Sequence, residues 1–292
     1  MMMKKKILAG ALATLCALAM HAAPMQQMRF HCDRDTTRIN QLLDKGLQSG
    51  LKTGNALVTF YAHQLEGTPY VGHTLEGDRE VLTINIDELD CTTFVETLYA
   101  LARTTLEGRR SWRDYAAHLE SVRYRGGIMG DYSTRLHYIS EWIIDNFARG
   151  NLREVTADIP HSQHQIKTIN FMTAHRDAYR SLKNDSLMTQ RIRHVEAKLI
   201  NHRMPVLKKS WLGSKDVKAA LREGDFVGLV TNVDGLDISH MGIIVMDEKG
   251  EPHLLDASLS GGRVMLEAKP LKQHLSGSKS TTTAVRVFRM NN

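Results

Sequence analysis

The sequence contains few cysteines and prolines, and it lacks the strongest metal and nucleotide motifs. Three cysteines in 292 residues exclude a disulfide-framed mini-protein and a cysteine-rich zinc fold. No H-E-x-x-H, paired C-x-x-C, Walker loop, G-x-G-x-x-G or G-x-S-x-G pattern occurs. His161 and His164 have H-x-x-H spacing, but no third ligand is near them in the sequence. We interpret this pair as part of a solvated loop, and we expect neither a metal nor a cofactor.

The composition is that of an ordinary globular protein. Apolar residues make up 42% and charged residues 24%, which excludes disordered, collagen-like and coiled-coil chains. A chain of this length can bury a full core without staples. The formal net charge is +6, but three of the lysines stand at positions 4–6. Without them the net charge is about +3, so nothing in the composition requires a nucleic-acid partner.

The first residues have the layout of a secretory signal peptide. The lysines at 4–6 precede an uncharged apolar run, Ile7–Met20, and the small residues Ala22 and Ala23 follow. The run is shorter than the ~20 residues needed to span a bilayer as a helix, although a membrane anchor is the alternative. We therefore predict a signal peptide over residues 1–22 and export, most simply to the periplasm. No other segment is long and apolar enough to cross a membrane.

The remaining chain, residues 23–292, is predicted to form one α+β domain. Residues of about 30–203 show mostly helical spacing, and residues of about 204–290 read as mostly antiparallel sheet. The expected helices are 36–47, 55–65, 91–101, 111–122, 136–147 and 186–199. The expected strands are 81–86, 226–230, 241–245, 253–259, 264–266 and 284–288.

Three residues could together carry nucleophilic chemistry. Asp90 is a plausible N-cap for an amphipathic helix that begins at Cys91, where unpaired N–H groups and the helix dipole favour a thiolate. The charge of Asp90 opposes this effect, so a base is still needed. His240 stands where a loop enters an apolar strand, and Asp256 interrupts the next one, where a charge is costly unless paired. In one arrangement Asp256 orients His240 and His240 activates Cys91.

The register of the two strands decides whether this arrangement is possible. With Gly242 opposite Asp256, His240 and Asp256 share one face of the sheet diagonally, whereas a slip of one residue separates them. Structural alternatives remain open at this point. Cys32 and Cys91 could form a disulfide in an exported protein, His240 could be a structural histidine, and Asp256 could pair with an arginine.

Three segments of the sequence resemble the catalytic blocks of the NlpC-type, papain-like cell-wall hydrolases. These segments are Asp90–Glu96, Ser239–Ile243 and Leu254–Ser258. The closer resemblance is to the N-acetylmuramoyl-L-alanine amidase-like family within that superfamily. Further blocks at 130–138, 142–146 and 284–289 support it, and the resemblance extends over about residues 35–290.

The resemblance implies a fold, an activity and a set of catalytic residues. The fold is a papain-like NlpC-type core, with the cysteine helix packed on an antiparallel sheet, together with an additional helical subdomain. The implied nucleophile is Cys91, the base is His240, and the third residue is Asp256, a position that is often histidine in the superfamily. The implied reaction is hydrolysis of the amide between N-acetylmuramic acid and L-alanine in muropeptides, including those with an anhydro-muramic end. Cell-wall recycling and remodelling are both compatible roles.

Peptidoglycan fragments are the expected partners, and Tyr132, Arg135, His137 and Tyr138 are the expected substrate contacts. The alternative for this block is a helix start with Tyr138 buried. Two further functions remain open. One is a cysteine endopeptidase that cuts within the stem peptide, and the other is a non-catalytic peptidoglycan-binding protein with Cys32 and Cys91 oxidised.

Overall fold

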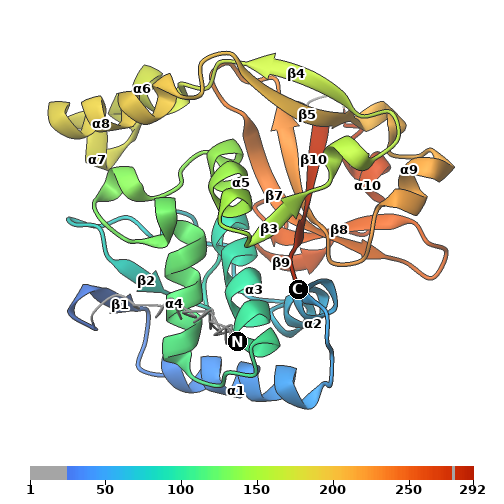
Figure 1. The fold of residues 1–292 in the computed structure, drawn as a ribbon, viewed down its shortest axis with the longest axis horizontal. Coiled ribbons are helices and arrows are strands. Elements are labelled where there is room, and N and C mark those ends of the chain that lie inside the picture. The colour runs from blue at the N-terminus through green and yellow to red at the C-terminus, as the bar shows by residue number, and fades with distance from the viewer. Residues whose placement is uncertain (1–24, 278–279) are drawn as a thin grey trace, which may run out of the picture.

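The computed structural model describes residues 25–277 and 280–292, which combine helices with an antiparallel sheet in an α+β fold (Figure 1). The predicted signal peptide at residues 1–22 lies outside the described residues. In the part of the chain that is described, no helix has the length and apolar character needed to cross a bilayer.

The longer α-helices all lie before residue 200 of the chain. The α-helices of the described residues are α1 (Asp35–Gln48), α2 (Gly54–Gln64), α3 (Cys91–Leu106), α4 (Trp112–Arg123), α5 (Ile139–Ala148), α6 (Phe171–Ala174), α7 (Arg180–Lys183), α8 (Ser186–Ala197), α9 (Lys215–Ala220) and α10 (Leu271–His274). Figure 1 shows α6, α7 and α8 together at one end of the molecule, away from the C-terminus.

Strands occur from the start of the described chain to its end. They are β1 (Met28–Phe30), β2 (Leu82–Ile84), β3 (Leu152–Glu154), β4 (Gln163–Lys167), β5 (His202–Lys208), β6 (Phe226–Thr231), β7 (Ile238–Met246), β8 (Pro252–Ser258), β9 (Arg263–Leu266) and β10 (Thr282–Met290). The main sheet has the order β4-β5-β10-β6-β7-β8-β9, with β3 also paired to β10, and its pairings are antiparallel. Strands β1 and β2 form a separate parallel pair.

Helix α3 lies at the centre of the core and packs against β7 and β8, with α2 and α4 beside it (Figure 1). Its apolar residues Phe94 and Leu98 join Ile243 and Leu255 of the sheet in one buried cluster. Full burial of one such side chain stabilises the fold by about 2 kcal/mol. The packing of α3 against the sheet therefore fixes where the first turn of the helix stands relative to β7 and β8.

One prediction about the secondary structure was wrong in detail. The helix expected over 136–147 begins only at Ile139, because the preceding residues are extended and bridge back to the end of α4: Arg135 pairs with Tyr124, and the Leu136 N–H donates to the carbonyl of Arg123. The mostly helical region of about 30–203 also includes strands that the sequence did not predict. It contains the short strands β1, β3 and β4, which are stabilised by pairing with distant segments and have little local signal.

Candidate active site

A capping box fixes the start of α3 and so the position of Cys91. The backbone N–H of Thr93 donates to the Asp90 carboxylate over 2.8 Å, and the backbone N–H of Asp90 donates to the Thr93 hydroxyl over 2.9 Å. Cys91 is the first residue of the helix, is half-buried and carries a free thiol. The expected N-cap is confirmed, and the thiol stands at the positive end of the helix dipole.

The register of β7 and β8 is the one that the catalytic arrangement requires. Ile243 pairs with Leu255, and continuing this antiparallel register by one residue places Gly242 opposite Asp256. A Cβ atom on Gly242 would lie 2.9 Å from the Cβ of Asp256, so only glycine leaves the space beside this carboxylate. His240 and Asp256 consequently share a face, and His240 Nε2 is hydrogen-bonded to Asp256 Oδ2.

Strand β7 has a β-bulge at Ser239, directly before His240. His240 pairs with Leu229 of β6, but the next pair along the strands joins Ile238 with Val230, so Ser239 is one residue extra. Bulges of this kind bend a strand and redirect a side chain, and they are common beside active sites. The sequence pattern showed a loop entering a strand here and did not reveal the bulge.

The surroundings of His240 favour its protonated form. Its burial works against a charge, but hydrogen bonds to Asp256 and Cys91, together with the negative charges of these two groups, outweigh burial and raise its pKa to about 10. Asp256 is almost fully buried, and its second oxygen, Oδ1, makes no hydrogen bond among the described residues. The imidazolium therefore lies between a buried carboxylate and the thiol of Cys91.

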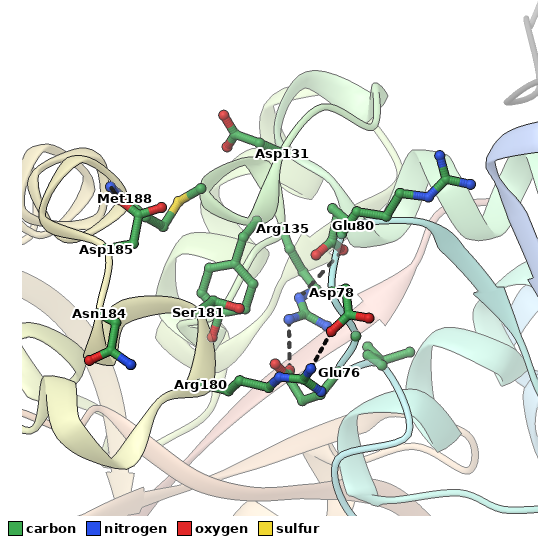
Figure 2. A pocket seen from close by; sticks show the side chains of 14 residues that line it. Glu76, Asp78, Glu80, Asp131, Arg135, Arg180, Ser181, Asn184, Asp185 and Met188 are labelled. Atoms are coloured by element: carbon green, nitrogen blue, oxygen red, sulfur yellow. Dashed lines mark hydrogen bonds and ion pairs between the residues drawn. The ribbon is translucent and has the colours of Figure 1, made fainter.

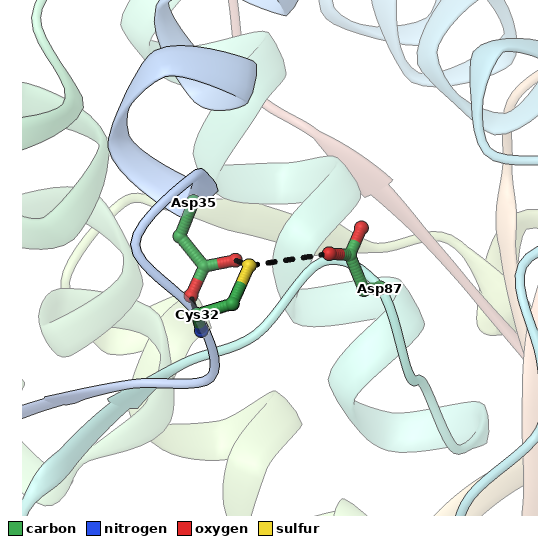
Figure 3. A group of neighbouring side chains, drawn as sticks. All are labelled: Cys32, Asp35 and Asp87. Carbon is green, nitrogen blue, oxygen red and sulfur yellow. Dashed lines mark hydrogen bonds between the residues drawn. The ribbon is translucent and has the colours of Figure 1, made fainter.

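Cys32 does not pair with Cys91, so the disulfide alternative does not describe this structure. Both thiols are free, and Cys32 donates instead toward Asp35 and Asp87, with a distance of 3.6 Å to each carboxylate (Figure 3). The spacing of these three side chains could accommodate a metal ion. Each carboxylate already has protein partners, however: Asp35 accepts the backbone N–H groups of residues 31 and 32, and Asp87 pairs with Arg38.

The two histidines with H-x-x-H spacing have different surroundings. The ring of His161 stacks on Trp211 with 3.9 Å between centroids, and its Nε2 is 2.8 Å from Asp216. His164 lies in strand β4 and is exposed. The pair thus belongs to a surface turn and an edge strand.

Tyr70 is a member of the site that sequence reasoning missed. Burial raises its pKa, and the nearby negative charges of Cys91 and Asp90 raise it further. The loop that carries it is held on both sides, because the Tyr70 N–H donates to the carbonyl of Gly262 over 2.9 Å and the Val71 N–H donates to the carbonyl of Leu89 over 3.1 Å. No motif surrounds Tyr70, so only the fold places it beside the thiol.

Two adjoining cavities extend from the start of α3. The smaller one, of about 170 Å³, is lined by Asp90 and Thr92, the neighbours of Cys91 in the chain. The larger one, of about 430 Å³, lies between the 75–80 segment and helices α7 and α8 (Figure 2). Leu75, Glu76 and Arg135 line both cavities, so the two share a wall.

Three of the four expected substrate contacts line these cavities: Arg135 lines both, Tyr132 the larger and His137 the smaller. Arg135 is 5% exposed, lies 2.8 Å from Glu76 and stacks over the Tyr132 ring at 4.8 Å. Burial, reinforced by the charge of Arg135, lowers the pKa of His137 to about 3, so its neutral ring donates from Nε2 to the carbonyl of Tyr132. Whether these residues bind substrate remains a prediction.

Tyr138 packs in the same buried cluster as Tyr132 but lines neither of the two cavities. It is 2% exposed, its hydroxyl donates to Glu196 over 2.7 Å, and the same hydroxyl accepts the backbone N–H of Met172 over 2.7 Å. It joins α5 to α6 and α8, which is the structural alternative that the sequence left open. Its assignment as a substrate contact stays a prediction, and neither cavity supports it.

A separate cavity of about 430 Å³ adjoins the imidazole and the carboxylate. His240 and Asp256 line it, and the other polar residues of its wall are mainly hydroxyl-bearing: Ser258, Ser260, Ser280 and Thr282. Apart from Asp256, this cavity is lined by no carboxylate of the described residues.

The fold and these side chains define an α+β protein in which a thiol, an imidazole and a carboxylate meet, the combination that nucleophilic hydrolases use. The chain belongs to the N-acetylmuramoyl-L-alanine amidase-like family, whose family model matches residues 61–282. It is similar to the crystal structure of an N-acetylmuramoyl-L-alanine amidase from Bacteroides uniformis, with 32% identity and a TM-score of 0.77. That similarity covers 82% of this chain and 99% of the other.

Two other solved structures show the same architecture. A candidate xylanase from Bacteroides fragilis is 38% identical, with a TM-score of 0.73, over 78% of this chain and 99% of that one. A protein from Legionella pneumophila is 19% identical, with a TM-score of 0.67, over 89% of this chain and 95% of that one, and this similarity shows the fold alone. The comparison with curated proteins gives no match.

Proposed function

We propose that the protein is a cysteine-dependent amidase that hydrolyses the amide between N-acetylmuramic acid and L-alanine in muropeptides. The observation that carries the proposal is the imidazole of His240, whose pKa is raised to about 10 between Asp256 and Cys91. A protonated imidazole beside a thiol at a helix start is the form in which cysteine acts as a nucleophile. The amidase-like family and the relative from Bacteroides uniformis support the choice of bond.

The proposed reaction has two steps. Sulfur of Cys91 attacks the carbonyl carbon of the muramic lactyl group, the C–N bond breaks, and His240 gives its proton to the leaving amine of L-alanine. N–H groups of the first turn of α3 face the developing oxyanion. Water then attacks the thioester with His240 as the base, which releases the muramic carboxylate and restores the thiol. Asp256 orients His240 and stabilises its charge.

The same proposal covers the type of fold and the location. The fold we propose is a papain-like NlpC-type core with an additional helical subdomain, and the packing of the cysteine-bearing helix on the antiparallel sheet supports it. A single catalytic domain over 23–292, preceded by a signal peptide over 1–22, would act on peptidoglycan fragments in the periplasm. The proposed reaction uses only side chains of the protein and water, and it needs neither a cofactor nor a nucleic acid.

The test is mass spectrometry of muropeptides before and after incubation with the protein. An amidase releases the intact peptide and the free muramic sugar, whereas a stem-peptide endopeptidase leaves a shortened muropeptide. A binding protein leaves the muropeptide unchanged. Cys91→Ala serves as the inactive control. Cys32→Ala is the matched cysteine control, since within the described residues its thiol hydrogen-bonds to Asp35 and Asp87 and not to His240. Cleavage anywhere other than the sugar–alanine amide would overturn the proposal.

A further inference from the structure

Residues 71–77 form part of the wall beside the start of α3, and they contain no helix or strand. Three of them, His73, Leu75 and Glu76, line the smaller cavity together with the chain neighbours of Cys91. The backbone of such a segment has no ladder of hydrogen bonds of its own. Side chains from other elements must therefore hold it if the wall is to keep a single shape.

Arg29 of β1 holds this segment by its backbone. Its Nη2 donates to the carbonyl of Thr74 over 2.7 Å, and its Nη1 donates to the carbonyl of Glu76 over 3.1 Å. Nη2 also donates to the hydroxyl of Thr83 over 2.8 Å, and Thr83 is the buried residue of β2 that lies opposite Arg29 in the β1–β2 pair. The planar guanidinium thus joins a buried strand to two carbonyls of the wall in one fixed geometry.

The segment is held closely on both sides. A Cβ atom on Gly77 would lie 2.9 Å from Nη1 of Arg29, so glycine leaves the room that the guanidinium occupies. His73 has a φ of 63°, a left-handed conformation that is uncommon outside glycine and persists where surrounding contacts impose it. On the other side, the carboxylate of Glu76 lies 2.8 Å from Arg135. The two arginines therefore clamp the segment between them.

We propose that Arg29 is a positioning residue for the hydrolysis and acts through the 71–77 segment, which it holds in the shape that receives the substrate. This inference rests on the proposed amidase function. Arg29 lines neither cavity, so its effect on the substrate passes through the wall. A wall that is ordered in advance spares the substrate the cost of ordering it. Loss of Arg29 should consequently weaken substrate binding more than the chemistry at Cys91 and His240.

The test is the kinetics of Arg29→Gln on a muropeptide. Arg34→Gln is the matched control, because Arg34 is exposed, lines neither cavity and carries the same charge. For Arg29→Gln we expect KM to rise on the order of tenfold and kcat to stay within about threefold, with both unchanged in the control. Alkylation of Cys91 by iodoacetamide, which does not need the wall, should keep its wild-type rate. Arg29→Lys retains the charge without the planar fork and should restore KM only in part.

A wild-type KM in Arg29→Gln would overturn the inference and, with a lower melting temperature, would make Arg29 a purely structural residue. A matching fall in kcat and in the alkylation rate would overturn it as well, since the catalytic groups themselves would then be displaced. Failure of the proposed function looks different, because the full chain would not cleave the sugar–alanine amide. In that case hydrogen exchange of the 71–77 amides decides whether Arg29 holds the wall. Faster exchange in Arg29→Gln but not in Arg34→Gln supports this role, and equal exchange overturns it.

Discussion

The proposed catalytic arrangement and the larger cavity beside the start of α3 are built in different ways. Cys91, His240 and Asp256 are held by regular structure: a capped helix and two paired strands with a single register. The larger cavity is held by loops and short helices, with exposed ion pairs such as that between Asp78 and Arg180 at its mouth. Rigid elements give the precision that chemistry requires, whereas the looser wall gives a surface on which substrate choice can change without disturbing the chemistry.

The most severe test of this comparison is Cys91→Ala. We expect hydrolysis of muropeptides to fall below detection while the far-ultraviolet circular dichroism and the melting temperature stay close to wild type, since the half-buried thiol contributes little to packing. Cys32→Ala should retain turnover per folded molecule. Near-normal turnover in Cys91→Ala would end the cysteine mechanism.

Asp256→Asn tests the link between the carboxylate and the imidazole. The hydrogen bond to His240 can persist, but the charge is lost, and we expect turnover to drop on the order of ten- to a thousandfold. The pKa of His240 should also fall, so the alkaline limb of the pH–rate profile should move to lower pH. A lower melting temperature with unchanged turnover and an unchanged profile would show a purely structural carboxylate.

Gly242→Ala tests the register between β7 and β8. The added methyl group would meet the Leu254 side chain and the Leu255 carbonyl oxygen at 2.8 Å each, and the Cβ of Asp256 at 2.9 Å. We expect a loss of about 1–3 kcal/mol in the free energy of unfolding, measured by denaturant titration, together with reduced turnover. Gly72→Ala is the control, because nothing lies within 4 Å of its added methyl group. Equal stability of the two variants would contradict the close packing.

The protonation of His240 predicts the pH dependence. Its pKa is about 10 in the folded protein against 6.5 for the free group, so the ion pair stabilises the fold fully below pH 6.5 and this stabilisation is lost as the pH rises through 10. The proton donor for the leaving amine is lost over the same range. We expect kcat/KM to hold to about pH 9 and then to decrease; a decrease centred near pH 7 would contradict the raised pKa.

The smallest expected effect belongs to Tyr70→Phe. The hydroxyl lies within the field of Cys91, and its removal should lower kcat/KM about two- to tenfold without a change in folding. Tyr99→Phe, two turns further along α3, is the matched control and should leave kcat/KM unchanged. An unaltered rate in Tyr70→Phe would leave this residue a structural one.

Local patterns predicted the regular part of the site and could not predict the rest. The N-cap at Asp90, the helix after it and the strands around His240 and Asp256 follow from short-range chemistry, and the fold class follows from their order. Tyr70 and the bulge at Ser239 depend on which distant segments meet, which no local pattern records. Tyr138 is buried and lines neither cavity, which the sequence could not reveal because a buried tyrosine and a substrate-binding tyrosine look alike in it.

The position of β10 in the main sheet has a consequence for folding. This strand, the last of the described chain, is inserted between β5 and β6 and also pairs with β3. The sheet therefore cannot close until residues near 290 have been synthesised and brought back, and pairing between such distant segments is slow. A chain that stops before Thr282 would separate β4–β5 from β6–β9 and leave β3 without its partner, so unpaired edges would be prone to aggregation and degradation.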